Sequence, residues 1–306
     1  MKRRIRAMAP ILVFLALATT AGAQQTVNFP NFCDTSAFTL NGTAAGLNPN
    51  AQCVLRLTSS TGQSGSAFLT STFSLAADAS FSTFFSFQIL NSVGSSDVDG
   101  VGADGIVFAV QAVSNTAGGS GGGIGFSGIN NSVGVELDTW NNGGGDANSG
   151  NHIGIDINGN VNSVALMPIP GRFNDGNVWY VWVDYNGVTD LIEARVSTTP
   201  VRPAAASVSF TVDLPTVLGT SNAFVGFTSG TGAGGGAHEI VSWNLVGAFA
   251  PVGQTPTPGP TLTPTVPPTS TPVAGPAPTV PTLSFPMLAL LGLALAGAAM
   301  FLIRRA

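Results

Sequence analysis

Short runs of alternating apolar and polar residues recur from residue 24 to residue 250, separated by Gly, Asn or Pro. Alternation with a period of two residues is typical of strands that bury one face. No run in this region repeats its apolar residues with the 3.6-residue period of an amphipathic helix. The pattern predicts an all-β domain with strands at 81–89, 106–111, 133–139, 153–157, 178–185, 191–197, 207–212, 223–228 and 238–246.

One predicted strand, 178–185, has large residues on both faces. Alternation points Trp179, Val181, Val183 and Tyr185 to one side and Val178, Tyr180, Trp182 and Asp184 to the other. A strand covered on both sides fits two stacked antiparallel sheets, so we expect a jelly-roll β-sandwich. Phe81, Phe85 and Phe87 are expected in its core.

The two ends of the chain differ in composition from this domain. Residues 1–23 combine Arg3, Arg4 and Arg6 with an apolar run at 11–18 and a small-residue site at 21–23, which predicts a signal peptide and export. Residues 251–281 are rich in Pro and Thr and predict an extended linker. Residues 282–306 contain an apolar stretch at 285–303 followed by Arg304 and Arg305, which predicts a transmembrane helix.

Charge narrows the possible partners of the domain. It contains all fifteen acids of the chain but only Arg56, Arg172, Arg195 and Arg202, a net charge of −11 with His neutral. Nucleic acids and anionic membrane surfaces are therefore poor partners for the domain, whereas cations and neutral ligands fit its charge.

The chain has two cysteines, Cys33 and Cys53. In an exported protein we expect them to form a disulfide, although two isolated buried thiols remain an alternative. On the chain-entropy model, closing this loop of about twenty residues is worth about 3 kcal/mol. There is no CxxC motif to indicate zinc binding or thiol redox chemistry.

Residues 133–159 concentrate the polar chemistry of the chain. In an extended strand, Val133, Val135 and Leu137 point to one face, and Glu136 and Asp138 point to the other. A polar loop at 140–150 follows, and the next strand begins at His152. Oxygen ligands suit calcium, and an added imidazole suits manganese or another transition ion. The alternative is a polar hairpin with solvated acids.

The order of these residues, E-x-D-x-aromatic-x-N, then Asp, then HIGIDIN, resembles the metal-binding signature of legume-type (L-type) lectins. ADGIVFAV at 103–110, GGGIGFSG at 121–128 and FVGFTSGTGAGGGAHEIVSWNL at 224–245 resemble further motifs of that family. The resemblance covers residues 27–246 and implies a concanavalin A-like sandwich that binds glycans without catalysis.

The resemblance also implies metal ligands. Its transition-ion ligands match Glu136, Asp138, Asp146 and His152, and a serine of that shell falls near Ser163. Its calcium ligands match Asp138, Asn142, Asp146 and the carbonyl of Trp140. Glycines at 143–145 replace the family's usual aromatic residue, and an insertion lies around residues 159–160.

For the sugar, the resemblance implies Asp104 and Asn142 as hydrogen-bonding residues, with a backbone N–H near Gly122 and a rim at Ala233 and Gly234. The Ala103–Asp104 peptide bond is expected to be cis. Trp140 either stacks on the sugar ring or packs beside the calcium loop. Family members often form dimers, so a homodimer is a further expectation.

The C-terminal arrangement of PTLS, an apolar helix and Arg-Arg resembles exosortase-associated sorting tails of Gram-negative bacteria. That resemblance implies a bacterial cell-envelope protein whose tail is recognised, and in some cases removed, by a processing enzyme.

A retaining glycosidase on the same fold needs a second carboxylic acid, but Trp140, Asn141 and Asn142 stand where it belongs. No nucleophile motif accompanies His152 or His238, and His238 is expected to open the last strand. We therefore expect no enzyme. A structural or adhesive module stabilised by calcium is the remaining alternative.

Overall fold

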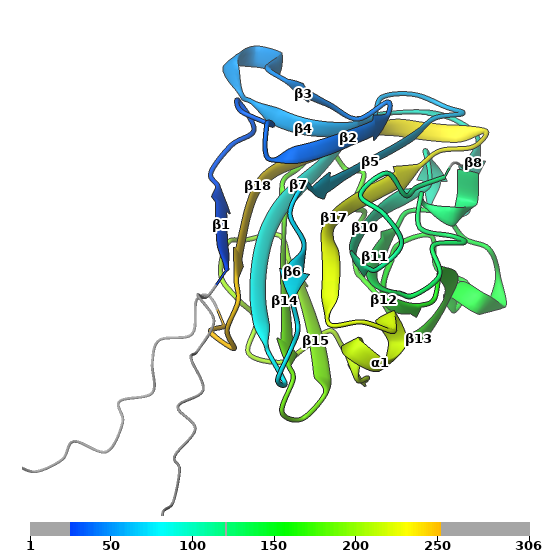
Figure 1. Cartoon of the computed structure of the whole chain (residues 1–306). Coiled ribbons are helices and arrows are strands. Elements are labelled where there is room, and N and C mark those ends of the chain that lie inside the picture. The colour runs from blue at the N-terminus through cyan, green and yellow to red at the C-terminus, as the bar shows by residue number, and fades with distance from the viewer. Residues whose placement is uncertain (1–24, 120, 252–306) are drawn as a thin grey trace, which may run out of the picture. The chain divides into compact units, whose positions relative to one another are not determined.

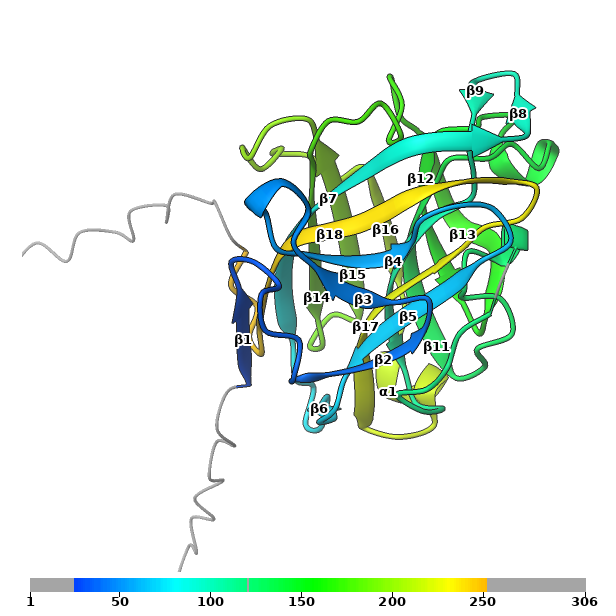
Figure 2. The same ribbon diagram turned by 90° about the horizontal axis from the view of Figure 1, so that it is seen from above.

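The computed structural model describes residues 25–119 and 121–251, which form two stacked antiparallel sheets (Figures 1 and 2). The first sheet has the order β16 (Val208–Thr211), β15 (Leu191–Ser197), β14 (Trp179–Asn186), β7 (Phe81–Gly94), β18 (Gly234–Val246), β4 (Val54–Thr58) and β3 (Ala45–Leu47), with β1 (Thr26–Phe29) paired to β18. The predicted all-β sandwich is confirmed.

The second sheet carries most of the predicted polar chemistry. Its order is β13 (Asn160–Pro168), β12 (His152–Ile157), β11 (Ser132–Asp138), β10 (Gly105–Gln111), β17 (Asn222–Gly230), β5 (Ser64–Leu69) and β2 (Phe38–Gly42), and β6 (Phe73–Ser74) pairs with β17. A separate hairpin is formed by β8 (Ser96–Asp97) and β9 (Gly100–Val101). The described residues also form three short 3₁₀ turns: η1 (Pro49–Ala51), η2 (Gly121–Gly123) and η3 (Gly144–Asp146).

Aromatic side chains from both sheets form the centre of the core. The ring of Phe227 on β17 lies 5.1 Å from that of Phe85 on β7 and 5.0 Å from that of Trp243 on β18, and Phe108 on β10 lies 6.0 Å from Phe85. All four side chains are buried. Phe227 packs edge-to-face on Phe85 and Trp243, whereas Phe108 and Phe85 are stacked, and both arrangements add to the free energy gained by burying the rings.

Both faces of β14 are covered, as the sequence indicates. Val181 and Val183 lie in the core between the sheets. On the opposite face Trp182 is buried, and the Asp184 carboxylate forms ion pairs with Arg195 and Arg202. The buried acid is therefore neutralised by two of the four arginines of the domain.

All nine predicted strands occur, with ends that differ by a few residues. The predicted start of the last strand is wrong. β18 begins at Gly234, so His238 is buried inside the strand and is not its first residue. The strands that were missed are short or rich in Gly, Ser and Asn, as β5 and β13 are.

The sequence pattern also missed one helix, α1 (Leu214–Leu218). The Asp213 side chain accepts a hydrogen bond from the N–H of Thr216 at its start, and Gly219 ends it with φ +70°. A single capped turn is too short to show a helical period, so only its capping residues were available as a signal.

The expected disulfide between Cys33 and Cys53 is confirmed, and it ties the segment before β2 to the start of β4. The predicted signal peptide and tail helix, and nearly all of the predicted linker, lie outside the described residues. Within residues 25–119 and 121–251, no helix is long and apolar enough to cross a membrane.

Candidate functional site

Two neighbouring strands, β11 and β12, bring three of the predicted metal ligands together. Asp138, the last residue of β11, is in register with Gly105 of β10 on one side and with His152 of β12 on the other. Val133, Val135 and Leu137 fill the core, so Glu136 and Asp138 project from the opposite face of the sheet. The strand alternation read from the sequence is confirmed here.

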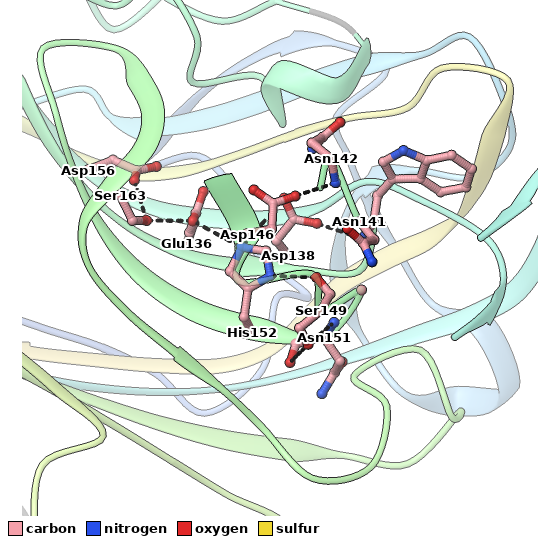
Figure 3. A network of polar contacts seen from close by, with 12 residues as sticks. Glu136, Asp138, Asn141, Asn142, Asp146, Ser149, Asn151, His152, Asp156 and Ser163 are labelled. Carbon is pink, nitrogen blue, oxygen red and sulfur yellow. Dashed lines mark hydrogen bonds and ion pairs between the residues drawn. The ribbon is translucent and has the colours of Figure 1, made fainter. Parts of the chain in front are cut away.

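Glu136, Asp138 and His152 form a buried cluster (Figure 3). The Nε2 atom of His152 lies 3.3 Å from Oε1 of Glu136 and 4.0 Å from Oδ2 of Asp138. The three candidate ligand atoms lie within 4.8 Å of one another. Two carboxylates and an imidazole at this separation are a donor set suited to a divalent transition ion.

The imidazole is oriented by its other nitrogen. Nδ1 of His152 lies 3.2 Å from the carbonyl oxygen of Ser149, which can only accept a hydrogen bond, so Nδ1 donates to it and Nε2 faces the carboxylates. Nε2 of His152 and Oε2 of Glu136 are buried and have no hydrogen-bond partners within residues 25–119 and 121–251. Buried polar atoms without partners are unfavourable, and a bound cation would satisfy both.

Ser163 on β13 also reaches this cluster. Its hydroxyl oxygen lies 2.6 Å from Oε1 of Glu136 and 2.7 Å from Oδ1 of Asp156. A Cβ atom on Gly154 would lie 1.9 Å from that hydroxyl, so the glycine makes room for it. Asp156 was not assigned a role from the sequence, although His152, Gly154 and Asp156 alternate onto one face of β12.

The loop at 139–151, here called the metal loop, folds back on the cluster. The N–H of Trp140 donates to Oδ1 of Asp138 at 2.5 Å, and the N–H of Asn142 donates to Asp146. Asp146 is buried at the end of η3. Gly143 has φ +92°, a conformation that favours glycine. Three of the four residues expected to hold calcium, Trp140, Asn142 and Asp146, therefore lie on this loop, and the fourth, Asp138, ends the strand that leads into it.

A pocket with a volume of about 280 Å³ opens beside this loop. It contains all six residues expected to contact sugar: Asp104, Gly122, Trp140, Asn142, Ala233 and Gly234. Ser95, Ala103 and Gly232 complete its lining. The Ala103–Asp104 peptide bond is cis, as expected. Oδ2 of Asp104 is buried and has no hydrogen-bond partner among the described residues.

Comparison with known proteins decides the family. Residues 24–257 match the family model of the legume lectin domain. This protein belongs to the legume lectin family. It is 30% identical to Lectin 8 of Medicago truncatula over 265 residues, which are 77% of this chain and 92% of that lectin. The family is non-catalytic, which confirms the expectation that the chain is no enzyme.

Other legume lectin relatives match in part. An L-type lectin-domain containing receptor kinase, VIII.1 of Arabidopsis thaliana, is 34% identical over 176 residues, 56% of this chain, and the match spans about a quarter (24%) of the kinase. The structure of a lectin from Bauhinia forficata, solved with GalNAc, superposes with a TM-score of 0.61 at 25% identity and covers 73% of this chain and 98% of that one.

The carboxylates in and around the buried cluster of this legume lectin lie close together and away from solvent. Burial, followed by the neighbouring charge of Glu136, raises the pKa of Asp138 and of Asp156 well above the ordinary value. The pKa of Asp104 is raised to about 6, because the increase caused by burial exceeds the decrease caused by the nearby N–H of Gly232. Legume lectins typically bind calcium and manganese, and a cation would lower the free energy of these crowded carboxylates.

Proposed function

We propose that this protein is a metal-dependent lectin that binds glycans reversibly. The observation that carries the proposal is the arrangement of Asp104 and Asn142 in one pocket, directly beside a buried Glu-Asp-His cluster. A carboxylate oxygen without a partner, placed in a pocket, is an acceptor available to a ligand hydroxyl.

Two cation sites follow from the donors on the metal loop and its flanking strands. Glu136, Asp138, Asp146 and His152 would hold manganese or another divalent transition ion. Asp138, Asn142, Asp146 and the carbonyl of Trp140 would hold calcium. The ions supply positive charge that offsets the crowded carboxylates. The chain itself then holds Asn142 and Asp104 in fixed positions at the pocket.

On the sugar side, Asp104 accepts hydrogen bonds from hydroxyl groups, and the Asn142 amide both donates and accepts. The N–H of Gly122 adds a donor, and Ala233 and Gly234 form the rim. Trp140 lines the same pocket and is half-buried, which leaves part of its indole available to stack on the apolar face of a sugar ring. The GalNAc bound to the Bauhinia lectin supports a glycan as the ligand class.

We further propose that the protein is exported and displayed at the bacterial cell envelope. This part rests on the composition of residues 1–23 and 251–306, including the apolar stretch that would enter the membrane and the sorting-tail pattern that a processing enzyme would recognise. Fractionation of the producing cells tests it: the protein should appear in envelope or surface fractions and not in the cytoplasm. A homodimer is proposed from family resemblance, and sedimentation velocity tests it.

A glycan array tests the binding function. The full-length chain is applied with calcium and manganese, then after chelation, and then as the Asp104→Asn variant, with Asp78→Asn as a charge-matched control. Asp78 is exposed and lies just before the start of β7, away from the pocket. A lost charge-assisted hydrogen bond of about 1.5–3 kcal/mol predicts at least tenfold weaker binding for Asp104→Asn.

Chelation should abolish binding, and Asp78→Asn should leave it unchanged. If the wild-type protein binds nothing on a broad array while calcium still raises its melting temperature, the protein is a structural module stabilised by calcium and the lectin proposal is wrong.

A further inference from the structure

The segment 95–102, here called the acidic hairpin, contains β8 and β9 and connects the end of β7 to Ala103 and Asp104. It carries two carboxylates, Asp97 and Asp99, that the family resemblance does not assign. Both side chains accept hydrogen bonds from backbone N–H groups of the metal loop.

Each carboxylate holds one limb of the metal loop. Oδ2 of Asp97 accepts a hydrogen bond from the N–H of Asn141 at 2.9 Å, at the start of the loop. Oδ2 of Asp99 accepts one from the N–H of Gly150 at 2.5 Å, near its end. The residues between these two anchors include Asn142 and Asp146, which are candidate calcium ligands.

Gly150 shows how closely the acidic hairpin approaches. A Cβ atom on this residue would lie 2.2 Å from Oδ2 of Asp97 and 2.8 Å from Oδ2 of Asp99. Only a residue without a side chain allows both carboxylates to come this near to the backbone. Two like charges this close to each other repel, so the N–H donors of the loop are what hold them there.

The same hairpin also borders the sugar pocket. Ser95, its first residue, and Ala103, which follows its last residue, line the pocket, and the N–H of Ser95 donates to the carbonyl of Ala233 at 3.0 Å. On the side of β9, the carbonyl of Val101 accepts a hydrogen bond from the Asn174 side chain at 3.0 Å. The acidic hairpin is therefore held by Asn174 at β9, and it contacts both the metal loop and the rim of the pocket.

We propose that Asp97 and Asp99 are positioning residues that hold the metal loop in its cation-binding shape and couple it to the sugar pocket. This inference rests on the proposed function. With both limbs held, Asn142 and Asp146 lose less conformational freedom when a cation binds, so the affinity for calcium rises.

The two carboxylates differ in a way that makes a sharp test possible. Asp97 uses both oxygens, because Oδ1 accepts from the N–H groups of Asp99 and Gly100 while Oδ2 accepts from Asn141. Asp99 uses a single oxygen, toward Gly150. An asparagine has one acceptor oxygen, so it replaces Asp99 without losing the contact but cannot replace Asp97.

The experiment compares Asp97→Ala, Asp97→Asn, Asp99→Ala and Asp99→Asn in the full-length chain, with Asp78→Asn as control. Calcium affinity is measured by calorimetry. Hydrogen exchange of peptides covering residues 139–151 is measured by mass spectrometry in the presence of EDTA. A cooperative melt in EDTA confirms that each variant folds.

We expect about tenfold weaker calcium binding and faster exchange in the metal loop for Asp97→Ala, Asp97→Asn and Asp99→Ala, with Asp99→Asn and Asp78→Asn close to the wild type. If all four hairpin variants weakened calcium binding equally, the loss of one negative charge would explain the result without any hydrogen bond to the loop. That outcome would overturn the proposal.

If the wild-type protein binds no calcium, the metal part of the proposed function is wrong, and exchange in EDTA then decides the positioning role alone. Faster hydrogen exchange in the metal loop for Asp97→Ala, Asp97→Asn and Asp99→Ala than for Asp99→Asn and the wild type supports the positioning role. Equal exchange rates in all of these proteins overturn it.

Discussion

A buried histidine in the last strand makes the stability of this protein depend on pH. His238 on β18 is buried, and its Nδ1 atom lies 2.6 Å from the Thr58 hydroxyl and 3.1 Å from the carbonyl of Gly236. Its Nε2 atom has no hydrogen-bond partner among the described residues. A proton on Nε2 would therefore place an unpaired donor and a positive charge in the interior.

Burial lowers the pKa of His238 from its ordinary value of 6.5 to about 4. Because the folded-state pKa lies below the unfolded-state pKa, the stabilisation is complete above pH 6.5 and is lost as the pH falls toward 4. The difference in pKa corresponds to about 3 kcal/mol of unfolding free energy lost between pH 7 and pH 4.

The His238→Gln variant isolates this contribution. Urea unfolding of both proteins is followed by tryptophan fluorescence in EDTA at pH 7 and pH 4. The acidic residues titrate in both proteins and cancel in the comparison. The wild type should lose about 3 kcal/mol more than the variant over this interval. Parallel pH dependences for the two proteins would refute the reasoning, since they would mean that His238 is not held neutral by burial.

Three further predictions concern the metal cluster and the disulfide. Glu136→Gln removes the repulsion on its neighbouring acids, so it should raise the melting temperature in EDTA while reducing the increase caused by calcium and manganese; a lower melting temperature in EDTA would contradict this. Gly154→Ala places a methyl group against the Ser163 hydroxyl and Glu136, so both side chains must move and calorimetry should show weaker manganese binding. Unchanged manganese affinity would contradict this prediction. Replacing both Cys33 and Cys53 by Ala should lower the unfolding free energy by about 3 kcal/mol in urea, and a loss below about 1 kcal/mol would contradict the loop-entropy reasoning.

Much of the fold was predictable because the long strands of the core alternate clearly. The run at 133–138 placed apolar residues on one face and acids on the other, and this alternation alone oriented Glu136 and Asp138 correctly. The candidate donors of the metal loop were predicted from their oxygen and nitrogen ligand chemistry and from the resemblance to legume-type lectins.

What escaped prediction depends on contacts between distant segments. Asp97 and Asp99 look like ordinary turn residues in SDVDG, and only the folded chain brings them to Asn141 and Gly150. His238 likewise looks like a polar residue at a strand end, but a glycine-rich start of β18 extends the strand beyond it. In both cases the neighbouring sequence does not indicate which distant residues the side chain contacts.

Reversible metal dependence of glycan binding tests the central claim most directly. The protein bound to its best array glycan is treated with EDTA, its metal content is measured by atomic emission, and calcium and manganese are then restored. The account predicts that binding disappears with the metals and returns with them, because Asn142 and Asp104 are held by the metal loop and its neighbours. Full binding by protein shown to be free of metal would contradict it.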